Sequence, residues 1–167
     1  MILESRPEKY SDHASGERHL PTVERSARVQ YTAEQMFDLV NDVERYPEFL
    51  HWCRDVRVLK RTETEVEARM DVGMLGIQQS LRTRNTLERP RRIRISLVSG
   101  PFKELDGEWR FTDMVGGGSD VSLNLRFETG FTPFGMLFAK IFEEIAGAQM
   151  HAFVTRAASV YGQGSEI

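Results

Sequence analysis

Apolar and polar residues alternate along the middle of the chain, as in strands that bury one face. Residues 65–73, EVEARMDVG, place Val66, Ala68, Met70 and Val72 on one side, and the charged residues between them, Glu67 included, are expected in solvent. The strands expected from this pattern are residues 22–31, 55–61, 65–73, 76–87, 92–99, 105–112 and 120–128. Because turns and no helices separate the last six, the pattern predicts an antiparallel meander.

The expected strand at 105–112 carries a glycine on its buried side. Leu105, Gly107, Trp109 and Phe111 share that side, and Gly100-Pro101 breaks the chain just before the strand. Glycine inside a strand is typical of a bend or of a place where another group approaches closely. The pattern of residues does not identify which group approaches the glycine.

Two short helices are expected after the first strand. Thr32 and Gln35 have the spacing of a capping box, which predicts a helix start at Thr32. Pro47 disfavours helix at Tyr46 and suits a first helical position, so a second short helix is expected from Pro47. It would carry Phe49, Leu50 and Trp52.

The end of the chain has helical periodicity. Apolar residues recur at that spacing after Pro133, and Gly162 is a natural stop, which predicts one amphipathic helix of about 25 residues or slightly more. Gly147 is expected to be its weak point, since glycine in a helix costs about 1 kcal/mol relative to alanine. The apolar stripe comprises Phe134, Leu137, Phe138, Ile141, Phe142, Ile145, Ala148 and Ala152.

This order of elements predicts an α+β fold in which a curved antiparallel sheet grips the long C-terminal helix. A curved sheet and a straight helix cannot pack closely along their full length, so a space lined by large apolar side chains is expected between them. Residues 21–162 would form this single domain, with a disordered N-terminal tail at 1–20 and a C-terminal tail at 163–167.

Charge is concentrated in one stretch of a chain whose net charge is −3. Residues 81–95 contain six arginines and a single acid, Glu88. Arginine favours bidentate contacts with phosphates and carboxylates. Two interpretations stay open, a solvated hairpin or a contact with a polyanion or anionic lipid, for which Arg82, Arg84 and Arg94 are the candidates.

Three segments together resemble a known family: YPEFL at 46–50, GPFKELDGEWRF at 100–111, and the Phe-rich last helix. They are similar to the START-like (SRPBCC) polyketide cyclase and coenzyme Q-binding protein family, with its helix-grip fold. The likeness runs from Val23 to Tyr161 and is greatest to the bacterial branch that includes ribosome association toxins.

The resemblance implies a non-catalytic domain with a hydrophobic tunnel. It also implies one of two functions. Proteins of one branch bind ubiquinone and support respiratory electron transport as a carrier or chaperone. Proteins of the other branch bind the large ribosomal subunit and block subunit joining. Gly107 would then bend its strand and leave room beside Trp109 for a ligand chain. The expected ligand-binding residues are Tyr46, Trp52, Gly107, Trp109, Leu125, Phe127, Phe138, Ile141, Phe142 and Ile145.

The chain shows no catalytic constellation. No metal-binding or nucleophile motif is present, and the pair His51 and Cys53 lacks a third group, so Cys53 is interpreted as structural and no metal or catalytic cofactor is expected. A cyclase or hydrolase is therefore the weakest hypothesis. No apolar run reaches membrane-spanning length, and we expect a cytoplasmic protein with peripheral contact at the inner face of the membrane.

Overall fold

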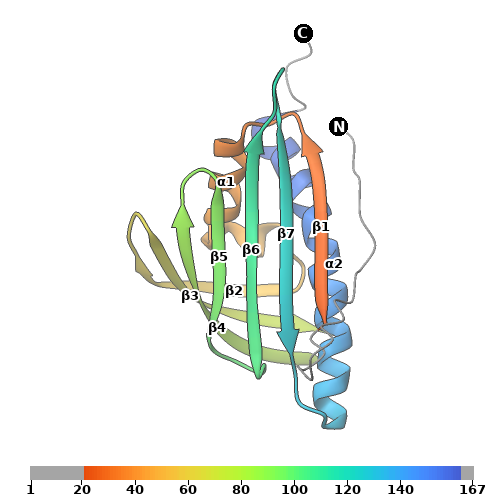
Figure 1. Ribbon diagram of the computed structural model, residues 1–167. Helices are drawn as coiled ribbons and strands as arrows, with labels where there is room; N and C mark the ends of the chain where they lie inside the picture. Colours follow the sequence, from red (N-terminus) through yellow and green to blue (C-terminus); the bar gives the residue numbers. More distant parts are fainter. Residues whose placement is uncertain (1–20, 163–167) are drawn as a thin grey trace, which may run out of the picture.

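A computed structural model describes residues 21–162; the expectations for tails at 1–20 and 163–167 lie outside this range. Seven antiparallel strands form one sheet in the order β1-β7-β6-β5-β4-β3-β2, which confirms the predicted meander (Figure 1). The strands are β1 (Thr22–Val29), β2 (Cys53–Arg61), β3 (Glu65–Met74), β4 (Ile77–Glu88), β5 (Arg92–Ser99), β6 (Glu104–Asp113) and β7 (Ser119–Glu128).

The sheet curves strongly, and the long helix α2 (Pro133–Tyr161) lies along its inner face beside β1 and β7, as Figure 1 shows. Along β7, Val121, Leu123, Leu125 and Phe127 are buried, while Asn124 and Arg126 between them are exposed. The inner face and α2 together enclose the hydrophobic core, so the expected helix-grip α+β fold is confirmed.

Helix α1 (Ala33–Asn41) begins as predicted. The Thr32 hydroxyl accepts a hydrogen bond from the Gln35 N–H at 3.1 Å, and the Gln35 side chain accepts one from the Thr32 N–H at 2.9 Å. Each bond satisfies a backbone donor that the first helical turn leaves unpaired.

The expected second short helix is present, but its predicted start at Pro47 is wrong. A 3₁₀-helix, η1 (Val43–Glu48), ends there instead, with Pro47 in its last turn. In a 3₁₀-helix residues i and i+3 share a face, so Val43 and Tyr46 are buried together against the core. Burial of this pair outweighs the local preference of Pro47 for a helix start.

Helix α2 has 29 residues, which confirms the prediction of one long helix of about 25 residues or slightly more. The Thr132 hydroxyl caps its start by accepting from the Gly135 N–H at 3.0 Å, and Gly162 ends it with φ of 83°. Arg25 explains the glycine at position 147: its Nε donates to the Gly147 carbonyl at 3.3 Å, and a Cβ at Gly147 would lie 2.8 Å from Arg25 Nη2. The guanidinium of Arg25 on β1 thus lies against the backbone of α2 at Gly147.

Candidate functional site: an apolar cavity beneath α2

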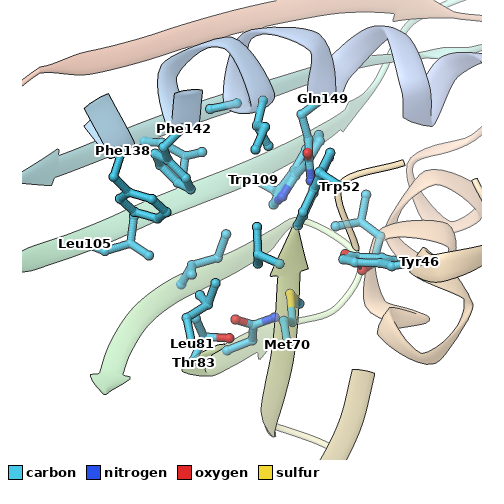
Figure 2. A pocket seen from close by; sticks show the side chains of 17 residues that line it. Tyr46, Trp52, Met70, Leu81, Thr83, Leu105, Trp109, Phe138, Phe142 and Gln149 are labelled. Carbon is cyan, nitrogen blue, oxygen red and sulfur yellow. Dashed lines mark hydrogen bonds between the residues drawn. The ribbon is translucent and has the colours of Figure 1, made fainter. Parts of the chain in front are cut away.

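A cavity of about 90 Å³ lies between α2 and the inner face of the sheet (Figure 2). Phe138, Phe142 and Leu105 close one end of it, and Tyr46 and Trp52 lie at the other. The lining side chains are Val40, Tyr46, Trp52, Met70, Val72, Leu81, Thr83, Asn85, Ile95, Leu105, Trp109, Leu125, Phe138, Phe142, Ile145, Ala146 and Gln149. No charged side chain is among them.

The helical wall follows from residue spacing on α2. Phe138, Phe142, Ile145 and Gln149 recur at intervals of three or four residues, so they project from one face of the helix toward the sheet. Strands β3 and β4 supply the opposite wall, because alternate residues of each strand point inward.

The structure brings most of the expected ligand-binding residues to this cavity. Those that line it are Tyr46, Trp52, Trp109, Leu125, Phe138, Phe142 and Ile145. Phe127 and Ile141 are buried but lie outside the lining, and Phe127 packs against Phe102 and Phe142 instead. Ligand binding by any of these side chains stays a prediction.

Gly107 does not leave the expected room for a ligand chain. A Cβ at this position would lie 2.3 Å from Leu125 Cδ2 and 2.8 Å from the Asn124 carbonyl oxygen. Leu125 of the paired strand therefore fills the space that the missing side chain leaves, and Gly107 does not line the cavity. The group that approaches closely is a core leucine, and the expected room beside Trp109 is not at Gly107.

The ring of Tyr46 lines the cavity, whereas its hydroxyl forms a hydrogen bond with the backbone of α1. The hydroxyl donates to the carbonyl of Val40, which lies in the last turn of α1 and would lack an intrahelical partner. Burial raises the pKa of the Tyr46 hydroxyl far above its ordinary value, with smaller contributions from Cys53 and Asp42. It is thus a neutral donor bound to α1.

Two polar lining residues, Thr83 and Asn85 of β4, were not among the expected site residues. Thr83 is 4 % exposed and Asn85 is 7 % exposed, and both occupy inward positions of β4 between Leu81 and Leu87. Residues 76–87 alternate less regularly than the other strands, because polar residues occupy inward positions that are apolar elsewhere. This irregularity is the feature of the sequence that could have identified Thr83 and Asn85. Gln149 of α2 was missed because a single glutamine on a helix has no such signature.

The candidate arginines lie on the outer face of the sheet within a network of carboxylates. Glu67 on β3 accepts from Arg82 and from Arg84, each at 3.4 Å. The side chain of Glu67 is only 12 % exposed, so its expected solvation is wrong: two arginine side chains of the neighbouring strand cover it. Arg94 lies opposite Glu108 in the register of β5 and β6. Polyanion contact by these arginines stays a prediction.

Cys53 is buried and its environment suppresses thiolate formation. Burial raises the pKa of the Cys53 thiol to about 12, and the nearby Asp55 and Asp71 add to this effect. His51, by contrast, is exposed. Within residues 21–162 no cluster of His, Cys, Asp or Glu could hold a metal ion, and no helix is long and apolar enough to span a membrane.

The segment just before α2 and the first turns of α2 expose large apolar side chains near the end of the cavity closed by Phe138. Phe134 is 48 % exposed and stacks on Phe138 with ring centroids 6.2 Å apart. Phe131, Met136 and Leu137 are more exposed still. Such a patch is typical of a surface that meets a lipid or another macromolecule.

Comparison with known proteins matches residues 29–154 to the family described as polyketide cyclase / dehydrase and lipid transport. The chain is 45% identical over 141 residues to the ribosome association toxin RatA of Vibrio cholerae, covering 84% of this chain and 98% of that protein. It is 26% identical over 137 residues to the mitochondrial coenzyme Q-binding protein COQ10 homolog B of Xenopus laevis, covering 80% of this chain and 56% of that protein.

Solved structures show the same fold. The Zhui aromatase/cyclase from Streptomyces sp. R1128 superposes with a TM-score of 0.75 at 18% identity, covering 88% of this chain and all of that one. The family model covers most of the chain and the solved structures share its sheet and gripped helix, so the chain belongs to the polyketide cyclase / dehydrase and lipid transport family.

Proposed function

We propose that the protein binds a lipophilic molecule of the ubiquinone type in the cavity beneath α2 and acts as its carrier or chaperone in support of respiratory electron transport. The observation that carries this proposal is the apolar, uncharged cavity enclosed by α2 and the sheet. Ligand sites are mainly apolar with few polar groups. The family description includes lipid transport, and the Xenopus relative is named as a coenzyme Q-binding protein.

The size of the cavity has a consequence for loading. Its volume of about 90 Å³ is well below the roughly 300–1,000 Å³ of sites that enclose drug-sized ligands. A quinone with an isoprenoid tail must therefore displace a wall. The first turns of α2 are the wall with the most exposed apolar side chains, and their displacement would place Phe131 and Phe134 against a membrane. We place this action in the cytoplasm, with peripheral contact at the inner face of the membrane.

The two tryptophans of the chain provide the test, because both Trp52 and Trp109 line the cavity. Quinones quench tryptophan fluorescence on contact, so titration with decylubiquinone is expected to quench the protein saturably. Ala146→Leu, which fills the cavity from α2, should weaken this quenching. Ala158→Leu, on the same helix but outside the cavity, is the matched control and should leave it unchanged.

Native mass spectrometry of the purified protein, followed by lipid extraction, identifies a co-purified ligand. Absence of saturable quenching, together with equal behaviour of the two alanine variants, would refute ligand binding in this cavity.

Ribosome association is the second candidate, favoured by the 45% identity to RatA over nearly the whole of that protein. The proposed partner is the large ribosomal subunit, contacted through the outer-face arginines. Changing Arg82, Arg84 and Arg94 to Gln should weaken ribosome co-sedimentation, and each lost phosphate contact should flatten its salt dependence by about one log-log unit. The control with the same charge change is Arg45, Arg57 and Arg61 to Gln. Equal co-sedimentation of both triple variants at every salt concentration would exclude this surface.

A further inference from the structure

Among residues 21–162, one polar atom that lines the cavity has no hydrogen-bond partner. Asn85 is more than nine-tenths buried, and its Oδ1 has no hydrogen bond. A buried polar group without a partner is unfavourable, and most such groups in folded proteins are satisfied. Within residues 21–162 the one other such atom is Asn41 Oδ1, in the last residue of α1 and outside the cavity lining.

The protein offers Asn85 no obvious partner from the adjacent strands. Its cross-strand neighbours are Val66 on β3 and Ile95 on β5, whose side chains are apolar. The other polar side chains of the lining are Thr83, two residues earlier on the same strand, and Gln149 on α2. Figure 2 shows Thr83 and Gln149 on opposite walls of the cavity.

We propose that Asn85 binds the polar head of the ligand and that this head is uncharged. The inference rests on the proposed function. An amide both donates and accepts hydrogen bonds, so it matches the carbonyl or hydroxyl oxygens of a quinone, quinol, ketone or alcohol. A hydrocarbon without a head group would leave Asn85 unpaired.

Charge decides against the commonest lipid head groups. None of the lining side chains within residues 21–162 carries a charge. Burial of a carboxylate or phosphate without a counter-charge is strongly unfavourable. The cavity therefore favours lipids with a neutral head group over fatty acids and phospholipids, whose head groups are charged.

Asn85→Leu is the direct test, with decylubiquinone as the probe and tryptophan quenching as the readout. The loss of one ligand hydrogen bond should weaken binding about tenfold, equal to about 1.4 kcal/mol. Removal of the unpaired amide should at the same time raise the unfolding temperature of the ligand-free protein. Asn85→Ala should also weaken binding. Because alanine is smaller than asparagine, weaker binding by this variant cannot result from a side chain that blocks the cavity. Asn124→Leu on the outer face is the matched control.

Competition tests the charge of the head group. At about pH 8, where a carboxylate is ionised, 2-undecanone should displace decylubiquinone at a concentration at least about tenfold lower than undecanoate. Parent-like quinone affinity in both Asn85 variants, or better competition by undecanoate, overturns this inference and leaves the proposed function standing. No binding of any of these probes by the parent protein overturns both.

Discussion

Replacement of Gly107 by alanine tests whether close packing, and not ligand room, explains the glycine. The added Cβ would lie 2.3 Å from Leu125 Cδ2 and 2.8 Å from the Asn124 carbonyl oxygen. The leucine methyl can move, because it is the far end of a flexible side chain. The carbonyl belongs to the backbone of β7, which is paired with β6 at this position, and cannot move without disturbing the ladder.

The expected magnitude follows from two opposing effects. Overpacking of a well-packed core costs about 1–3 kcal/mol. Replacement of glycine by alanine in a regular element recovers about 0.5–1 kcal/mol of conformational entropy. The close contact with a backbone atom makes the first effect larger, so Gly107→Ala should destabilise the fold by roughly 0.5–2 kcal/mol.

A double-mutant cycle separates the two contacts. Leu125→Ala alone should cost about 2–5 kcal/mol through the space it creates. In that background Gly107→Ala should cost less than in the parent, because the leucine methyl is gone, with a coupling of about 0.5 kcal/mol or more. The cost that remains is due to the Asn124 carbonyl.

Urea unfolding followed by tryptophan fluorescence measures the stability of the parent and of the three variants in the cycle. Gly130→Ala is the control, since nothing lies within 4 Å of a Cβ added there. Gly107→Ala with the stability of Gly130→Ala would refute the packing explanation. The same cost in both backgrounds would refute the contact with Leu125 and leave the Asn124 carbonyl as its cause.

Three further outcomes are expected. Amide exchange should be faster in residues 131–146 than in 148–160 and should slow with decylubiquinone; uniform exchange unaffected by the quinone would contradict a lifting helix. Cys53, with its thiol pKa raised to about 12, should react with Ellman's reagent at about pH 8 only on unfolding, since thiolate is the reactive form; rapid reaction of the folded protein would show an accessible thiolate. Tyr46→Phe leaves the Val40 carbonyl unpaired and should cost about 1–3 kcal/mol in urea unfolding, whereas an unchanged midpoint would mean that water replaces the hydroxyl.

The sheet and the helices were predictable because their patterns are local. Alternation in residues 65–73 and 120–128 places side chains on two faces whatever the neighbouring strands are. The capping box at Thr32 depends on residues three positions apart, and the stop at Gly162 depends on glycine's tolerance of positive φ. Pro47 is the exception, because burial of Val43 with Tyr46 decided the helix type there.

Much of the cavity could also be anticipated, since the apolar stripe of α2 and the inward residues of the strands had to face each other. Seven of the expected lining residues, Trp52 and Phe138 among them, do line it. Asn85 was not expected. A polar residue in an inward position weakens the strand pattern, and only the assembled walls show that it has no partner.

Strands, helices and their apolar faces can be predicted from the order of residues, because periodicity acts within a few residues along the chain. Contacts between groups that are distant in sequence follow only from the packed fold. Leu125 occupies the space at Gly107, Arg25 approaches Gly147, and Glu67 is covered by two arginines of β4. These contacts depend on strand register and on the placement of α2 against β1, which bring together residues that are far apart in sequence.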